Sequence, residues 1–420
     1  MTRRNFTLAL GAAGSALSAS NVLGANDKVR TALIGAGGRG SQDWETFLAE
    51  ADFEPVAVCD VYTPFRDRAI QTAKGKPSGH HDFRQVLERK DVDAVIVATP
   101  DHWHAAITVA ACNAGKDVYC EKPLSLTVAE GRKMLAAARK NNRVVQTGSQ
   151  QRSGAHYAQA VQLIREGGLG DVHRIHAGFQ RNIYPGLKPA EFDAAKLDWD
   201  FWLGPAPKVA FDPFRAIYNF RWFWDYSGGQ MTNWGAHHLD IARWILNADA
   251  PTTVSGTGGR YSLTDGGETP DLQQVSYQFP KAVVTWTASE ASEGKGVTLD
   301  ICGTKGTMTL LRNGYKVVPE QWPVSPGSKE RKPAMKAIEV KGGDLDHQHA
   351  RNFLDCVKSR KRPNADIEEG HRSAVMAHLG NISTRLGRTL TWDPVNEKVV
   401  NDTEANKWLD KAYRGNWKLV

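Results

Sequence analysis

VRTALIGAGGRG, residues 29–40, places a glycine-rich turn directly after a short run of β-branched and aliphatic residues. In such a turn the first glycine permits a tight bend, the second lets the backbone approach a pyrophosphate, and the third lets the following helix pack on the strand. The N-terminus of that helix supplies unpaired N–H groups for a phosphate. We therefore predict a dinucleotide site at this turn, formed by Gly35, Gly37, Gly38, Arg39 and Gly40.

Asp60 strengthens this prediction because it follows the next β-rich run, twenty residues after Gly40. A carboxylate at that place accepts hydrogen bonds from the adenosine ribose hydroxyls. It favours NAD over NADP by repelling a ribose phosphate, while Arg66 and Arg68 are close enough in sequence to keep NADP open. We expect NAD as the cofactor, tightly bound.

Residues 26–150 alternate β-rich runs with helical patterns, which predicts right-handed crossovers and a parallel, doubly wound Rossmann sheet. The predicted strands are Val29–Ile34, Phe53–Cys59, Ala94–Ala98, Asp117–Cys120 and Val144–Gly148. The predicted helices are Ser41–Glu50, Tyr62–Ala73, Phe83–Glu88, Ala105–Ala114 and Val128–Lys140.

Residues 151–394 predict a second domain, a substrate-binding α+β unit with an open, mostly antiparallel sheet, followed by a tail over 395–420. Strand patterns cover Val172–Gln180, Val254–Arg260, Gln273–Phe279, Ala282–Ser289, Gly296–Cys302 and Gly306–Leu311. Helical patterns cover Ala158–Glu166, Ala236–Leu246, Leu345–Lys358 and Glu368–Leu386. A long irregular stretch rich in aromatic residues lies between the first of these strands and Tyr226.

Two segments follow buried strands of the predicted Rossmann sheet, where ligands of open parallel sheets bind. Thr99, Pro100 and His104 follow one strand, and Glu121 and Lys122 follow the next. A lysine there acts as acid or base on a substrate hydroxyl when burial lowers its pKa. Ordinary surface turns remain the alternative interpretation of both segments.

A glycine turn at 228–229 leads into a helix on which Asn233, His237 and Asp240 share one face. We expect His237 to accept a proton or bind a hydroxyl, with Asp240 orienting it, and we expect no metal there. For the substrate we also expect contacts from Arg152, Trp224, Asn233 and His238. Aromatic faces pack on pyranose rings, although these aromatic residues could equally fill a core between domains.

The first 25 residues carry Arg3-Arg4 ahead of a short, weakly apolar stretch, which is typical of a twin-arginine signal. We expect a folded protein exported to the periplasm, free of the membrane after processing. The formal charge of +7 is modest and dispersed, which argues against nucleic acid as a partner. The five cysteines show no C-x-x-C spacing and predict buried thiols rather than disulfides or a zinc site.

Together these segments resemble the glucose-fructose oxidoreductase / inositol dehydrogenase / MocA (Gfo/Idh/MocA) family from about Lys28 to Pro394. The resemblance implies that Lys122 of the Glu-Lys-Pro segment is catalytic and contacts the cofactor. The family's Asp-x-x-x-His pair falls on Asn233 and His237, and asparagine can neither accept a proton nor hold a charge. Relatives that form dimers or tetramers imply a homo-oligomer here.

Three functional hypotheses follow. The first is an NAD(P)-dependent oxidoreductase that moves a hydride from a sugar or polyol carbon, with Lys122 and His237 removing the hydroxyl proton. The second is a redox-neutral glycosidase or lyase that uses tightly bound NAD to oxidise, eliminate and reduce again, acting on a glycoside. The third, a binding module without turnover, would require the complete dinucleotide motif to be vestigial.

Overall fold

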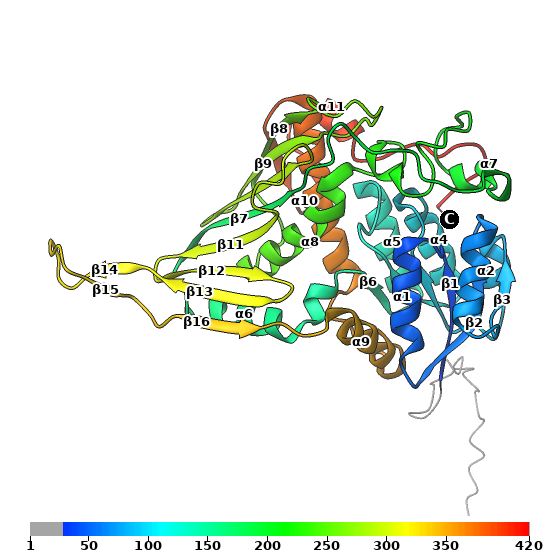
Figure 1. Ribbon diagram of the computed structural model, residues 1–420, viewed down its shortest axis with the longest axis horizontal. Coiled ribbons are helices and arrows are strands. Elements are labelled where there is room, and N and C mark those ends of the chain that lie inside the picture. Colours follow the sequence, from blue (N-terminus) through cyan, green and yellow to red (C-terminus); the bar gives the residue numbers. More distant parts are fainter. Residues whose placement is uncertain (1–27, 420) are drawn as a thin grey trace, which may run out of the picture.

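The structure is a computed structural model that describes residues 28–419, so the predicted leader over residues 1–25 lies outside the described residues. It contains a six-stranded parallel sheet and a ten-stranded mixed sheet, joined by helices that lie between them (Figure 1). The prediction of a Rossmann domain followed by a domain with an open, mostly antiparallel sheet is confirmed.

The parallel sheet has the strand order β3-β2-β1-β4-β5-β6. The chain runs outward from β1 through β2 to β3 and then crosses to β4 on the other side of β1. This reversal of strand order creates a switch point at the carboxyl ends of β1 and β4, where α/β sheets bind ligands. The strands are β1 (Val29–Ile34), β2 (Phe53–Cys59), β3 (Ser78–His80), β4 (Ala94–Val97), β5 (Asp117–Cys120) and β6 (Val145–Thr147). The helices between them are α1 (Gly38–Leu48), α2 (Thr63–Thr72), α3 (Phe83–Leu87), α4 (Asp101–Asn113) and α5 (Val128–Lys140).

The second half of the chain completes the helical layers of this sheet. Helix α9 (Leu345–Ser359) packs beside α1, where Phe353 meets Phe47 edge to face with ring centroids 5.9 Å apart. Helix α10 (Ile367–Leu386) packs against α5 and β6. The two sheets are therefore fixed to one another by shared helices rather than by a linker.

The mixed sheet has the strand order β16-β13-β12-β11-β7-β10-β9-β8-β17-β18. Its strands are β7 (Val172–Gln180), β8 (Thr253–Gly259), β9 (Leu272–Gln278), β10 (Val283–Ser289), β11 (Val297–Gly303), β12 (Gly306–Leu311), β13 (Gly314–Pro319), β16 (Ile338–Lys341), β17 (Leu390–Asp393) and β18 (Lys398–Val399). Strands β7 and β10 pair in parallel, and the other pairs are antiparallel. The hairpin β14 (Gln321–Pro323) and β15 (Arg331–Pro333) projects from one end (Figure 1).

Helices α6 (Ala155–Arg165), α8 (Gly229–Leu246) and α10 pack on the mixed sheet around one apolar core. Alternation along the strands explains this core, because every second residue of β9 and β10 points inward. Helix α8 is central to it and has buried residues on nearly every side.

The irregular segment 181–228 crosses the carboxyl-end edge of the Rossmann sheet. It contains η2 (Ala194–Lys196), α7 (Trp199–Leu203) and η3 (Asn219–Trp222). Residues of α7 and η3 share an apolar cluster with Tyr62. The Trp103 indole N–H donates to the Trp202 carbonyl over 2.8 Å. The end of the chain, after α11 (Thr403–Lys407), returns to the same place, where the Trp417 and Trp103 rings lie 4.8 Å apart.

Four helices begin three or more residues before the predicted start, and α4 and α8 differ most. Helix α4 begins at Asp101 rather than Ala105, because Pro100 and Asp101 suit the first turn of a helix. Helix α8 begins at Gly229 rather than Ala236, so the expected glycine turn overlaps its first turn. The second correction matters for the site, because it places Asn233 well inside the helix.

Across residues 28–419, no helix is both long enough and apolar enough to cross a bilayer. The five cysteines are buried, and none forms a disulfide. Buried thiols were the prediction for them, and it is confirmed.

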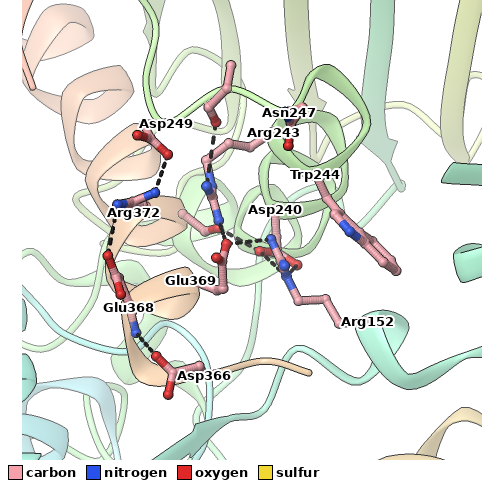
Figure 2. A network of polar contacts seen from close by, with 12 residues as sticks. Arg152, Asp240, Arg243, Trp244, Asn247, Asp249, Asp366, Glu368, Glu369 and Arg372 are labelled. Atoms are coloured by element: carbon pink, nitrogen blue, oxygen red, sulfur yellow. Dashed lines mark hydrogen bonds and ion pairs between the residues drawn. The ribbon is translucent and has the colours of Figure 1, made fainter. Parts of the chain in front are cut away.

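A buried network of ion pairs fixes α8 to the residues that follow the Rossmann sheet (Figure 2). The Arg152 Nε atom lies 2.9 and 2.8 Å from the two carboxylate oxygens of Asp240, and both side chains are almost fully buried. Glu369 of α10 pairs with Arg152 and with Arg243. Ser373 donates to Asp240 over 2.6 Å. The carboxylates of Asp240 and Glu369 therefore hold together α8, α10 and the segment that carries Arg152.

Replacing Arg152 by methionine should leave the Asp240 charge buried without its main partner. We expect the Arg152→Met variant to lose about 3–5 kcal/mol of unfolding free energy in urea denaturation. Arg372 offers a matched control at the edge of the same network, because its partner Asp249 is mostly exposed. Arg372→Met should cost about 1 kcal/mol or less. Equal losses in the two variants would contradict the role given to the Arg152–Asp240 pair.

Candidate functional site

A cavity of about 520 Å³ lies at the carboxyl ends of β1, β2, β4 and β5. Its walls are the turns that follow these strands, together with part of the irregular segment 181–228. All the predicted cofactor-binding residues except Gly40 line it, namely Gly35, Gly37, Gly38, Arg39, Asp60, Thr99, Pro100, His104, Glu121 and Lys122. The fold thus brings together residues that are spread over nearly ninety positions of sequence.

The turn after β1 has no room for side chains at two positions. Gly35 has φ +90°, and a Cβ atom there would lie 2.6 Å from the backbone nitrogen of Thr99. A Cβ atom on Gly40 would lie 2.0 Å from the Gly35 carbonyl oxygen. Helix α1 begins at Gly38, and the first N–H groups of a helix have no partner within it. The turn therefore offers backbone donors at the cavity, as a pyrophosphate requires.

Asp60 supports the turn through its own carboxylate. Oδ2 accepts the N–H of Ala36 over 2.7 Å, and Oδ1 accepts the N–H of Tyr62 over 2.8 Å. Burial raises the pKa of Asp60 to about 6, although these backbone donors oppose the rise. Arg68 donates to the Ala36 carbonyl over 3.2 Å, so a cation also lies beside this end of the cavity. The carboxylate has free lone pairs for ribose hydroxyls.

Arg39 and Glu121 connect the glycine turn with the end of β5. Arg39 Nε lies 3.1 Å from Glu121 Oε1, and its Nη2 atom lies 2.7 Å from Asp43 and 3.0 Å from Asp346. Glu121 also accepts the backbone N–H of Lys122 over 3.1 Å. Burial opposes the charge on Arg39, but its carboxylate partners outweigh burial and raise its pKa far above the ordinary value. This ion cluster fixes the backbone that carries Lys122.

His104 connects the two loops that follow β4 and β5. Its Nδ1 atom lies 2.7 Å from the Pro123 carbonyl and its Nε2 atom 2.9 Å from the Thr99 carbonyl. A ring with two carbonyl partners needs both N–H groups and is therefore an imidazolium. Burial opposes this charge, but Cys120 and Asp101 help to raise the pKa of His104 to about 10. His104 is a cross-link of the cavity wall.

Lys122 reaches out of the Rossmann domain towards α8. Its Nζ atom donates to Asn233 Oδ1 over 3.0 Å. Burial lowers the pKa of Lys122 to about 8, with Arg221 contributing to the fall and Glu121 opposing it. An amine with this pKa exchanges a proton near neutral pH, as an acid–base catalyst must.

His237 lies one helical turn after Asn233 on α8, as the sequence predicted. Its ring is 4% exposed, and its Nδ1 atom has no hydrogen-bond partner in the described chain. Burial, reinforced by the charges of Lys122 and Arg312, lowers the pKa of His237 well below 6.5. The ring is therefore neutral at physiological pH and accepts hydrogen bonds. His238 is equally buried, with a pKa lowered to about 3 by burial.

The predicted partner of His237 is engaged elsewhere. Asp240 accepts hydrogen bonds from Arg152 and Ser373, and the structure gives it none to His237. Arg152, expected at the substrate, is therefore part of the buried network and does not line the cavity. The predicted spacing of His237 and Asp240 along α8 was correct. The residue that packs against Asp240 is Arg152, which the sequence alone could not place there.

The aromatic segment around residue 222 is not an extended chain with alternating faces. Residues 219–222 form η3, and Trp222, Phe223 and Tyr226 are buried in the cluster with Tyr62. Trp224 lines a separate cavity of about 290 Å³, where Arg385 lies 4.3 Å from its ring centroid. Core packing is therefore the role of most of this segment, and Trp224 lies outside the predicted cofactor cavity.

Sequence reasoning missed several residues that line the cofactor cavity. They come from the irregular segment, and they are Phe201, Trp202, Ile217, Tyr218, Phe220 and Arg221. The aromatic enrichment of the segment was the only signal available, because no periodicity marks where its side chains point. These residues cover the cavity on the side opposite the sheet.

The arrangement combines a dinucleotide cradle with an acid–base pair. Lys122 can exchange a proton, neutral His237 can accept a hydrogen bond, and Asn233 can only orient its neighbours. Within residues 28–419, no three His, Cys, Asp or Glu side chains gather as a metal-ion site.

Three sequence profiles match the chain. The one described as "Oxidoreductase family, NAD-binding Rossmann fold" matches residues 29–149. The "GFO/IDH/MocA C-terminal domain" matches residues 157–309, and the "Oxidoreductase family, C-terminal alpha/beta domain" matches residues 317–419.

Curated relatives include Inositol 2-dehydrogenase 1 of Saccharopolyspora erythraea, 35% identical over 69% of this chain and 76% of that one. The scyllo-inositol 2-dehydrogenase (NAD(+)) of Bacillus subtilis is 25% identical over 80% and 88%. A glycosyl hydrolase family 109 protein of Stenotrophomonas maltophilia is 31% identical over 44% and 43%. Levoglucosan dehydrogenase, solved with NADH and levoglucosan, has the same fold with a TM-score of 0.66, 19% identity and coverage of 87% and 99%.

The close approach of Gly40 to Gly35 gives a direct test of the cradle. Gly40→Ala should weaken NAD binding by about tenfold or more, because the new Cβ atom must push the turn away from α1. Titration of the purified protein with NAD in a calorimeter measures this. Gly38→Ala is the matched control, because a Cβ atom there meets nothing within 4 Å and the backbone donor is kept. The interpretation fails if both variants bind NAD equally well.

Proposed function

From the premise that the chain belongs to the Gfo/Idh/MocA family of NAD-dependent oxidoreductases, we propose that it oxidises a hydroxyl group of a sugar or polyol. The observation that carries the proposal is the contact of Lys122 with Asn233, one turn before His237, at the end of the dinucleotide cradle. Sugar and polyol dehydrogenases among the relatives support the substrate class.

The described residues fit a bound NAD. The glycine turn offers backbone donors, Asp60 offers a carboxylate, and the cavity extends to Lys122. When bound, NAD accepts a hydride from the carbon that bears the hydroxyl group. Segment 181–228 covers the cavity and is fastened to α4 by the Trp103–Trp202 hydrogen bond. This cover supports tight retention of the cofactor, which we also propose.

Lys122 takes the hydroxyl proton in the proposed reaction. About one in ten of these side chains is the free amine at pH 7 when the pKa is about 8. Neutral His237 is the weaker base because its pKa is lowered further. It accepts a hydrogen bond from a substrate hydroxyl and so orients the substrate. Asn233 holds the Lys122 amine in place and takes no proton.

A redox-neutral cleavage of glycosides is the second candidate. The site has two different proton acceptors, Lys122 and His237, and elimination next to a transient ketone needs one for the hydroxyl and one for the C–H group. The partial match to a glycosyl hydrolase family 109 protein favours the same candidate.

We propose export by the twin-arginine route from Arg3-Arg4, and scarce free NAD outside the cytoplasm would suit a retained cofactor.

A substrate panel decides between the two candidates. Purified protein is mixed with free sugars, inositols and aryl glycosides while nicotinamide absorbance and released aglycone are followed in the same wells. Sustained reduction of added NAD supports the dehydrogenase. Aglycone release without net reduction supports the cleavage cycle, and neither signal with any compound would refute both.

Lys122 also predicts the pH dependence of turnover. The base form of an amine exists above its pKa, so kcat/KM for oxidation should rise with pH and level off above about 8. His237 is already neutral well below 6.5 and should add no second limb near neutral pH. Lys122→Ala should lower kcat by about 10²–10⁴ while NAD still binds. Near-normal turnover of this variant would remove Lys122 from its role.

A further inference from the structure

A chain of hydrogen bonds leads from Lys122 into the mixed-sheet domain. Lys122 Nζ donates to Asn233 Oδ1 over 3.0 Å, and Asn233 Nδ2 donates to Gln230 Oε1 over 3.2 Å. Gln230 Nε2 then donates to Glu290 Oε1 over 2.9 Å. The Arg181 Nε atom donates to the same carboxylate oxygen over 2.7 Å. Five side chains from four parts of the fold are thus connected.

The two ends of the chain fix its direction. An ammonium group only donates, so Asn233 must turn its oxygen to Lys122 and its NH₂ group to Gln230. A carboxylate only accepts, so Gln230 must turn its NH₂ group to Glu290 and its oxygen to Asn233. Both amides therefore point the same way, and each contact requires the next one.

The far end of the chain is rigid. Glu290 directly follows β10, is 1% exposed, and donates its backbone N–H to the Asp271 carbonyl over 2.8 Å. Arg181 lies over the Trp222 ring at 5.3 Å and over the Phe179 ring at 5.9 Å. An ion pair with a buried carboxylate and a guanidinium packed on two rings has few alternative positions. It is thus suited to hold the two amides that lead to Lys122.

We propose that Gln230, Glu290 and Arg181 are positioning residues for Lys122, and that their hydrogen-bond chain requires asparagine at position 233. The inference rests on the proposed function for its catalytic consequence and on the geometry alone for the coupling. An aspartate at 233 could not donate to Gln230 Oε1, so two acceptor oxygens would face one another there. The chain would then lose one of its contacts.

Charged groups from several elements face Lys122. They are Glu121 beside it, Asp101 of α4, Asp43 and Arg39 of α1, Arg221 of η3, and His237 of α8, whose own pKa the Lys122 charge helps to lower. Glu290 is two amides away and has no contact with Lys122. Removing the Glu290 charge can act on Lys122 through space or through the hydrogen-bond chain. In the N233D background these two routes predict shifts of the Lys122 midpoint in opposite directions.

The experiment measures the titration of Lys122 without any substrate. Purified protein is trace-labelled with acetic anhydride over a pH series, and the Lys122 peptide is quantified by mass spectrometry. The variants are Q230M, N233D, E290Q, the double variant N233D/E290Q, and each of the last three with Q230M. The unchanged chain should show a midpoint near the pKa of about 8.

The chain predicts a reversal of sign. N233D should raise the Lys122 midpoint by about one unit or more, because a carboxylate then faces the ammonium. E290Q alone should lower it, since a negative charge is lost. In the N233D background, E290Q should raise the Lys122 midpoint. Glutamine at 290 can donate to Gln230 Oε1, which leaves the Gln230 NH₂ group free to donate to the carboxylate at position 233 and keep it ionised. Q230M should abolish this reversal.

The same shift of midpoint by E290Q in both backgrounds would overturn the proposal, since that is what an effect through space gives. Q230M also tests the chain alone, because it keeps the Glu290–Arg181 ion pair. It should lower the Lys122 midpoint as Asn233 loses its anchor, and an unchanged midpoint would contradict the chain.

Two further measurements separate this inference from other effects. D265N removes a buried carboxylate that pairs with Arg260 in the same domain, so it should lower the thermal unfolding midpoint without moving the Lys122 titration. The pH profile of kcat should follow the Lys122 midpoint in each variant. Absence of turnover in every protein would reject the proposed function, while the Lys122 titration would still decide on the chain.

Discussion

The hydrogen bond from Lys122 to Asn233 is the contact on which the site depends, because it joins the end of β5 to the second turn of α8. Neither residue could reach the other unless the two sheets were rigidly fixed. Helices α9 and α10, which come from the second half of the chain, fix the two sheets to one another by packing on the Rossmann domain. The Arg152–Asp240 pair then fixes α8 along its own axis (Figure 2). A buried ion pair of this kind specifies one arrangement more than it adds stability.

Burial opposes the charge on three basic groups of the site, and their partners decide the outcome. Burial lowers the pKa of Lys122 and His237, and nearby cations lower each further. His104 is just as buried, but both of its nitrogens meet carbonyl oxygens, and it stays charged. The same low-dielectric setting therefore makes two groups available for proton transfer and turns a third into a structural cation.

The Rossmann half was predictable from sequence because its signals are local. The glycine turn and Asp60 lie within about thirty residues of one another, and each strand is a short run that can be recognised by itself. The Lys122 segment could be placed at a strand end for the same reason. Arg152 and Trp224 lie away from the cofactor cavity, which the sequence could not show because a single arginine or tryptophan has no periodicity. The pairing of Gln230 with Glu290 spans sixty positions and depends on the register of a sheet that no sequence pattern fixes.

Asparagine at 233 changes what Lys122 can do. A carboxylate in that place would stabilise the ammonium and raise the pKa of Lys122, so fewer side chains would be free amines near neutral pH. The amide keeps the orientation of the amine without that charge. The negative charge lies instead on Glu290, paired with Arg181 and separated from the amine by two amides. A lysine that is oriented without an adjacent carboxylate is more often a free amine near neutral pH, so loss of the aspartate–histidine relay is compatible with oxidation of a hydroxyl group.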